Sequence, residues 1–188
     1  MAGHGHGGDH GGDNKPIALL IAVLALFLAL AETGAKGAQT EALGRNIEAA
    51  NLWAFFQART IRQTTVRTAA EQEALAVPGA DEARRAATER QIAAWRSTAD
   101  RWESEPSTGE GRRELAARAR AAEGRRDRSL AAYHMYEYGS AAFQVAIVVA
   151  SASIVTGVSL LAVGGIVLGV IGVALSALGL FAPEMIHF

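Results

Sequence analysis

The side chains best suited to chemistry lie at the amino terminus, where histidines and aspartates alternate with glycines. Three histidines and two aspartates fall within the first 13 residues: His4, His6, Asp9, His10 and Asp13. Imidazole and carboxylate groups bind divalent metal ions, so this segment is a candidate for weak metal binding or proton sensing. A glycine-rich segment is typically disordered, however, and imposes no fixed ligand geometry. We therefore expect residues 1–15 to form a disordered tail without a resident metal.

Outside this tail, the ionisable side chains form no arrangement that is typical of catalysis. The chain has no cysteine, which excludes disulfides, thiolate metal sites and cysteine nucleophiles. No phosphate-binding loop, nucleophile elbow or histidine–glutamate zinc pair occurs in the sequence. His134 lies three positions before Glu137 and could pair with it on a helix face, with solvation at a membrane interface as the favoured alternative. We therefore predict no catalytic residues, no cofactor and no enzyme activity.

Arginine and tyrosine side chains gather just before the last apolar block of the chain. Arginine attracts anionic headgroups, and tyrosine favours the headgroup layer of a bilayer. A solvated helix face is the favoured alternative for the arginines, because they are interleaved with acidic residues. The candidates for contact with lipid headgroups are Arg125, Arg126, Arg128, Tyr133 and Tyr136.

Charged and apolar residues are segregated along the chain. Residues 36–128 contain 17 Lys or Arg against 14 Asp or Glu, whereas residues 139–188 contain a single charged residue, Glu184. This segregation is typical of a membrane protein with a soluble part. The near-neutral total and the mixed signs give no support for a nucleic-acid partner, which would need a clustered basic face. We expect the lipid bilayer to be a partner and nucleic acid not to be one.

The first apolar run extends from Ile17 to Ala31 without a polar residue. Its 15 positions span roughly 22 Å at about 1.5 Å per residue, and residues 16–35 together suffice for a ~30 Å hydrocarbon core. The sequence Ala29–Ala31 also has the small-x-small pattern of a signal-peptidase site. Only Lys15 supplies a positive charge before the run, so a permanent membrane helix over 16–35 is favoured over a cleaved signal.

The second apolar block, Ala141–Ala182, contains 42 residues without a charge. A single helix of this length would span ~60 Å, about twice the thickness of the hydrocarbon core. The block must therefore fold into a hairpin, and Gly164–Gly165 is the predicted turn. The two arms are predicted at 139–163 and 166–183, with Pro183 ending the second.

Small residues recur every three or four positions in both arms of this hairpin, which allows helix backbones to approach closely in lipid. They pack either the two arms against each other, which we favour, or neighbouring protomers. Neither arm contains Asp, Glu, His, Lys or Arg, the groups that ion-coupled transporters need at depth. The predicted helix-packing residues are Ala146, Ala150, Ser153, Gly157, Gly165, Gly169, Gly172 and Ser176.

Between the apolar blocks, residues 36–138 are rich in the strong helix formers Ala, Arg, Glu and Gln. Two segments with proline and glycine interrupt them, at 77–79 and 105–109. We predict helices at about 36–76, 80–104 and 110–138, the last continuing into the membrane. The predicted fold is all-α, with three transmembrane helices (one N-terminal and a C-terminal hairpin) and a coiled-coil-like helical stalk outside the bilayer.

Apolar spacing predicts which faces of the stalk helices pack together. The predicted packing faces are Leu43, Ile47, Ala50, Ala54 and Ile61 in the first helix, Ile92, Trp95, Ala99 and Trp102 in the second, and Leu115, Ala119 and Ala122 in the third. Trp53, Phe55 and Phe56 cannot all face one side of a helix, so at least one contacts another element. The large aromatics Trp53, Phe55, Phe56, Trp95 and Trp102 are candidates for contacts between protomers, with the core of the helical bundle as the favoured alternative.

Three short segments in the first third of the chain carry a family resemblance. They are the apolar run that ends at Ala31-Glu32, residues 38–43 (AQTEAL) and residues 51–60 (NLWAFFQART). Over residues 18–68 the sequence resembles the domain of unknown function 4337 family of bacterial membrane proteins, and the layout of three membrane helices is similar over most of the chain. The resemblance implies a permanent first helix and a bacterial inner (plasma) membrane, and it implies no activity.

Basic residues near the membrane predict the side on which the stalk lies. Six of them flank the stalk ends (Lys36, Arg45, Arg120, Arg125, Arg126 and Arg128), against Lys15 alone on the tail, which favours the cytoplasm. The signal-like Ala29–Ala31 and the size of the stalk favour the periplasm instead, and we prefer the cytoplasm. The expected function is a non-enzymatic membrane scaffold or accessory subunit that associates with itself or with another membrane protein. The alternative is a homo-oligomeric channel or pore lined by the glycine-rich hairpin.

Overall fold

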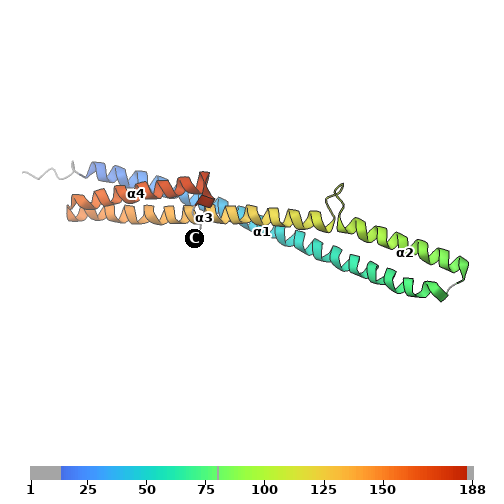
Figure 1. The fold of residues 1–188 in the computed structure, drawn as a ribbon. Helices are drawn as coiled ribbons and strands as arrows, with labels where there is room; N and C mark the ends of the chain where they lie inside the picture. Colours follow the sequence, from blue (N-terminus) through green and yellow to red (C-terminus); the bar gives the residue numbers. More distant parts are fainter. Residues whose placement is uncertain (1–13, 80, 186–188) are drawn as a thin grey trace, which may run out of the picture. The chain divides into compact units, whose positions relative to one another are not determined.

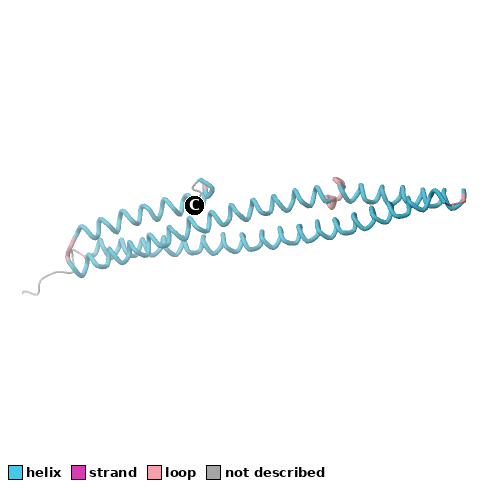
Figure 2. The backbone as a smooth tube through the Cα atoms, turned by 60° about the horizontal axis from the view of Figure 1, so that its bottom comes forward, coloured by secondary structure: helices cyan, strands magenta, loops and turns pink. Residues whose placement is uncertain are grey.

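The computed structural model describes residues 14–79 and 81–185, which form helices and no strand (Figures 1 and 2). The α-helices are α1 (Lys15–Ala76), α2 (Glu82–Glu103), α3 (Arg112–Thr156) and α4 (Ser159–Phe181), with short 3₁₀ turns at Val77–Gly79 and Pro183–Met185. The predicted all-α class is confirmed. Contacts divide the chain into unit 1 (Met1–Ala42 and Asp127–Phe188) and unit 2 (Leu43–Arg126), and each is described by itself below.

The ends of the helices follow from local sequence. Pro16 lies in the first turn of α1, where its missing N–H is harmless, and the next proline, Pro78, follows the end of this helix. The carboxylate of Asp81 accepts the N–H of Arg84 at 2.9 Å and caps the start of α2. The predicted boundaries of the second and third stalk helices lie within two residues of the observed starts and of the end of α2. The predicted first span and first stalk helix form one continuous α1.

Unit 1 holds the apolar part of the chain. Three helices of the described chain, α1, α3 and α4, are long and apolar enough to cross a membrane. Their apolar core contains Leu24 and Ala31 from α1 and Phe143 and Ala146 from α3. The rings of Phe27 and Phe143 stack with centroids 5.9 Å apart. Many other large apolar side chains of these helices stay exposed, as is expected of a surface that faces lipid.

The turn between α3 and α4 lies at a different position from the one predicted from the sequence. Helix α3 continues to Thr156, and the chain turns at Gly157–Val158, whereas Gly164 and Gly165 lie inside α4. Gly157 has φ of +70°, the left-handed conformation that ends a helix and that glycine adopts without strain. The arms are therefore α3 up to residue 156 and α4 from 159 to 181, in place of 139–163 and 166–183.

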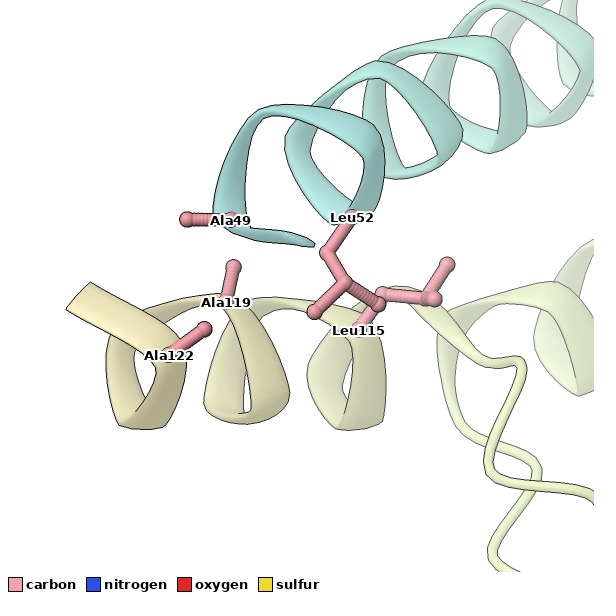
Figure 3. Close-up of a cluster of buried hydrophobic side chains, with 5 residues drawn as sticks. All are labelled: Ala49, Leu52, Leu115, Ala119 and Ala122. Atoms are coloured by element: carbon pink, nitrogen blue, oxygen red, sulfur yellow. The ribbon is translucent and has the colours of Figure 1, made fainter. Parts of the chain in front are cut away.

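Unit 2 pairs the second half of α1 with α2 and with the first turns of α3. The structure buries Ala49 and Leu52 of α1 against Leu115, Ala119 and Ala122 of α3, whose side chains point toward one another in Figure 3. On α2, Ile92 and Ala99 are buried and Trp95 and Trp102 are half-buried. The predicted packing faces of the second and third stalk helices are thus the ones that pack.

The predicted packing face of the first stalk helix is wrong. Leu43, Ile47, Ala50, Ala54 and Ile61 are all exposed, and α1 instead buries Ala49, Leu52, Gln63 and Ala70. The exposed set recurs in steps of three, four or seven residues and the buried set in steps of three, seven or eleven, all of which return to the same side of a helix. The two sets lie on opposite sides of α1, so spacing alone does not choose between them. The buried face is the one that allows the polar and aromatic side chains of α1 to meet partners on α2 and α3, as described below.

Candidate helix-association site

Glycines on one face of α4 bring it close to the other helices of unit 1. A Cβ atom at Gly165 would lie 3.1 Å from the carbonyl oxygen of Ala146 and 3.2 Å from Cβ of Ala150. A Cβ at Gly169 would meet Leu24 of α1 at 2.6 Å, and one at Gly172 would meet the ring of Phe143 at 2.8 Å. Since any larger residue would push these helices apart, the glycines permit the close contact on which helix association in lipid depends.

The structure places most of the predicted packing residues at this contact within the chain. Ala146, Ala150 and Ser153 of α3 are buried. Ser176 of α4 is half-buried next to Gly139, where a Cβ would lie 2.5 Å from its Oγ. Gly157 does not belong to this set, because it is exposed at the turn and a Cβ there would have no neighbour within 4 Å.

A shallow apolar groove of about 310 Å³ lies in unit 1 between α1, α3 and α4. Phe27, Gly34, Tyr136 and Ser176 line it together with aliphatic residues of α1 and α4. A Cβ at Gly34 would lie 2.8 Å from the ring of Tyr136, so this glycine makes room for the tyrosine. Tyr136, a predicted headgroup contact, therefore packs between helices of its own chain.

Trp53 and Phe56 belong to the core of unit 2. Their rings meet edge to face with centroids 5.4 Å apart and pack against the cluster in Figure 3. The indole Nε1 of Trp53 donates to the carboxylate of Glu123 on α3 at 2.8 Å. Phe55 points elsewhere, is 37 % exposed, and has the guanidinium carbon of Arg59 at 5.3 Å from its ring centre. The structure thus separates the three aromatics as their spacing requires.

A polar junction joins the three helices of unit 2 where α2 ends and α3 begins. Arg112 donates from Nη1 to Gln63 and to Glu103, at 2.8 Å each, and from Nε to the hydroxyl of Thr60 at 2.9 Å. The buried amide of Gln63 donates to the carbonyl of Ala99 at 2.8 Å and to Glu103 at 3.2 Å. The guanidinium of Arg112 also lies 5.0 Å from the ring centre of Phe56. Every member of the junction therefore has a partner on another helix.

The hydrogen bonds of this junction favour the ionised form of its acid. The amide of Gln63, followed by Arg113 and Arg112, holds the pKa of Glu103 below its ordinary value of 4.5. The carboxylate of Glu103 lies 2.8 Å from Arg112 and 3.3 Å from Arg113, and its side chain is 29 % exposed. Because solvent reaches it in part, the charge stabilises unit 2 less than a fully buried pair would.

The loop between α2 and α3 is closed at its base. The carboxylate of Glu114 accepts the hydroxyl of Ser104 at 2.6 Å and the N–H of Glu105 at 3.1 Å, which lowers the pKa of Glu114. Gly111 is buried, and a Cβ there would lie 2.7 Å from Cα of Ser104 and closer still to Glu105 and Glu114. Pro106, Ser107 and Thr108 at the tip are exposed, and the loop stands out from the helices in Figure 1.

The arginines predicted to contact lipid headgroups lie against α1 or in solvent. Arg125 donates to Glu48 at 3.2 Å, and Arg126 donates to the amide oxygen of Asn46 at 3.4 Å. Arg128 is exposed. The contacts of Arg45 and then of Arg125 lower the pKa of Glu48.

Tyr133 donates its hydroxyl to Glu137 at 3.2 Å rather than pointing to a distant element. Nδ1 of His134 lies 3.5 Å from the same carboxylate, as the spacing of the two residues indicates. Within residues 14–79 and 81–185, no group of three or more His, Cys, Asp or Glu is placed to hold a metal ion. The candidate ligands His4, His6 and His10 lie outside the described residues.

The polar junction was missed by the sequence analysis. One signal for it exists, because Gln63 interrupts the run of small and apolar residues that α1 buries at Ala49, Leu52 and Ala70. A glutamine at such a position predicts a buried polar partner on the facing helix.

Together, these features define a class: an all-helical protein with three helices long and apolar enough to cross a membrane and with a second, charge-rich helical unit. The family described as "Domain of unknown function (DUF4337)" matches residues 13–182, and the chain belongs to this family. The resemblance seen in the sequence is thereby confirmed. No curated protein and no solved structure matches the chain.

Proposed function

We propose that this protein is a non-enzymatic integral membrane scaffold or accessory subunit that acts through helix–helix association. In this proposal the apolar parts of α1 and α3 and the whole of α4 cross the bacterial inner membrane. Unit 2 forms a coiled-coil stalk on the cytoplasmic side. The stalk associates with itself or with another membrane protein, and the chain catalyses no reaction.

The observation that carries this proposal is the difference between the two units in which side chains pack together and which are exposed. In unit 1 the small residues of α3 and α4 allow close packing, and the large side chains exposed along the apolar segments 17–31 and 141–182 are mostly hydrophobic, as lipid requires. In unit 2 the buried and half-buried positions of α2 follow the steps of a coiled coil, Ile92, Trp95, Ala99 and Trp102, and the junction around Gln63 fixes the register of the helices. Two helical units of these different compositions in one chain suit a protein that is held in a membrane and binds partners outside it.

The packing of α4 favours the scaffold over the alternative of a pore lined by the glycine-rich hairpin. Gly165, Gly169 and Gly172 are buried against α3 and α1 of the same chain. The exposed side of α4 carries valine, leucine and isoleucine, among them Ile166, Val170 and Ile171. A water-filled path needs polar groups or backbone carbonyls along its wall, and neither is offered by this exposed side.

The test is native mass spectrometry of the complex extracted gently from native membranes. We expect a defined assembly of more than one chain, either copies of this protein or this protein with a second one at fixed stoichiometry. A second protein would make the chain an accessory subunit and would identify its partner. A closed ring of this chain alone that conducts ions in liposomes would favour the pore, and a bare monomer would contradict both proposals.

A further inference from the structure

The outward side of α1 in unit 2 carries almost no charge. Its central positions follow one another at intervals of seven residues, Ile47, Ala54, Ile61, Thr68 and Leu75, and all five are exposed. We define the outer stripe as these five residues together with the residues three and four positions from them between Leu43 and Leu75, which are Leu43, Gly44, Ala50, Asn51, Gln57, Ala58, Thr64, Thr65, Glu71 and Gln72. Every residue of the stripe is exposed, and Glu71 is its only charged member. Ile47 is 61 % exposed, Ile61 68 % and Leu75 83 %.

The outward sides of α2 and α3, the other helices of unit 2, carry charged residues. On α2, Arg90, Asp100 and Arg101 are exposed, and on α3, Arg113 and Arg120 are exposed. A helix that faces water normally carries charged residues on that side. The outer stripe therefore lacks the charged residues of a helix side that faces water, and it contains the residues that the sequence predicted to pack, which are exposed in unit 2.

The lack of charge also restricts what can cover the stripe. A partner with a charged face would bury its charges without a counterpart, which is costly. In a parallel pair of identical helices each residue lies opposite its own copy, so any charged residue at the centre would meet its like. The central positions from Ile47 to Leu75 contain none. They extend over 28 residues, four heptads, which is long enough for a two-stranded coiled coil.

The relative direction of α1 helices in neighbouring copies follows from their insertion in one membrane, so this inference rests on the proposed function. All copies insert the first apolar segment in the same direction, and α1 of each copy leaves the same face of the bilayer. Neighbouring α1 helices then run parallel, and confinement to one membrane raises their effective concentration. Beside Ile61 the exposed side of α1 carries the small, uncharged side chains of Thr64, Thr65 and Thr68, which leave room for side chains of a partner helix.

From these observations we propose that a second copy of this chain packs on the outer stripe, with the two α1 helices parallel and in register about a two-fold axis. Ile47, Ala54 and Ile61 of one copy then face the same residues of the other. The two α1 helices bury their exposed isoleucines between them, and the charged sides of α2 and α3 of both copies stay in water.

The test is disulfide cross-linking in native membranes, for which the absence of cysteine makes the chain well suited. Ala54→Cys and Ile61→Cys are compared with Ser97→Cys, an exposed position on α2. A disulfide needs Cα atoms within about 7 Å, a separation that a parallel seam provides between identical residues. We expect oxidation to link each stripe variant to itself and not to link the Ser97 variant. Stripe variants that link no better than the Ser97 variant would overturn the proposal.

A second variant tests the same contact without oxidation. Ile61→Lys places two like charges at the two-fold axis and is expected to lower the dimer association constant about tenfold or more. Ser97→Lys, with the same added charge on α2, is expected to leave it unchanged. An assembly that persists in native mass spectrometry without stripe cross-links, and that tolerates Ile61→Lys, would refute this inference and leave the proposed function standing. A monomer in every measurement would refute both.

Discussion

At the scale of single residues, Arg112 connects the helices of unit 2. Its guanidinium joins Thr60 and Gln63 of α1 to Glu103 of α2, whereas the neighbouring Arg113 donates to Glu103. The side chain of Arg112 is 23 % exposed and that of Arg113 is 73 % exposed. Two adjacent arginines that share one acid thus differ in how much of their contact is shielded from water, which makes them a matched pair for mutation.

Arg112→Ala is expected to lower the free energy of unfolding of unit 2 by about 1–3 kcal/mol, because it leaves the buried side-chain oxygen of Gln63 without its donor and removes one of the donors to Glu103. A unit of this size should then unfold at a temperature lower by roughly 4–8 °C for each kcal/mol. All three tryptophans of the chain, Trp53, Trp95 and Trp102, lie in unit 2, so tryptophan fluorescence of the purified chain in detergent reports on it. Arg113→Ala serves as the control and should change the midpoint little. Equal losses in the two variants would contradict the assigned role of the junction.

Acid should weaken the same unit. The carboxyls of Glu48, Glu103 and Glu114 have folded-state pKa values below 4.5, held there first by Arg45, Gln63 and Ser104 respectively. A lowered pKa contributes stability at pH values above the unfolded pKa, and this stability is lost as the pH falls through the folded pKa. Denaturant unfolding followed by fluorescence should therefore show lower stability at about pH 3 than at about pH 6.

Glu103→Gln should reduce this dependence on pH, because the variant has no carboxyl at that position to protonate. At neutral pH the variant is expected to be less stable than the natural chain, and in acid the two should converge. Glu89→Gln, at an exposed position on α2 outside the outer stripe, is the matched control. A pH dependence that is the same in Glu103→Gln as in the natural chain would mean that other acids govern it.

At the scale of elements, three glycines at or near the turn between α3 and α4 differ in backbone conformation and in the space that surrounds them. Gly157→Ala should destabilise the hairpin by about 1–2 kcal/mol, because its φ of +70° is strained for a residue with a Cβ. Gly165→Ala should also destabilise it, since the new Cβ would lie 3.1 Å from the carbonyl oxygen of Ala146. Gly164→Ala should be tolerated, because its nearest neighbour, Cγ1 of Val149, would lie 3.6 Å away.

The midpoint of thermal unfolding of the chain in detergent, followed by circular dichroism, gives the order of these variants. If Gly164→Ala were the most damaging of the three, the turn would lie at Gly164–Gly165 after all. The comparison is informative because all three substitutions add the same methyl group to the same hairpin.

The hairpin of α3 and α4 and the packing face of α1 show which features could be predicted from the sequence. Composition and proline positions gave the helices and their limits, because a proline or a capping aspartate acts locally. The choice between Gly157 and Gly164–Gly165 as the turn could not be made locally, since it depends on which glycine another helix needs for close contact. The prediction of the packing face of α1 was wrong for a similar reason. This helix has two possible packing faces, and only the partners of Trp53 and Gln63 on other helices decide which one is buried.

At the scale of the whole molecule, the proposed arrangement in the membrane makes a prediction about two exposed positions. With three spans, the tip of the loop at Ser107 and the turn at Val158 must lie on opposite sides of the bilayer, because α3 crosses it between them. Ser107→Cys and Val158→Cys each introduce the only thiol of the chain.

In spheroplasts, a maleimide that does not cross membranes should label the Val158 variant at once and the Ser107 variant only after the membrane is opened. This result is expected for a cytoplasmic stalk. The reverse pattern would place the stalk in the periplasm and leave the three spans intact. Labelling of both variants in closed spheroplasts would contradict the three-span arrangement itself.

The closed base of the loop between α2 and α3 has a practical consequence. Ala99 and Glu103 on one side and Arg112 on the other are each tied to Gln63, and Glu114 and Gly111 hold the two ends of the loop together. The length of the tip at Pro106–Thr108 is therefore uncoupled from the register of the helices, and extending a surface loop costs little in conformational entropy. An epitope or a small fluorescent protein inserted after Ser107 would report where the chain resides in a living cell without altering the helices that it marks.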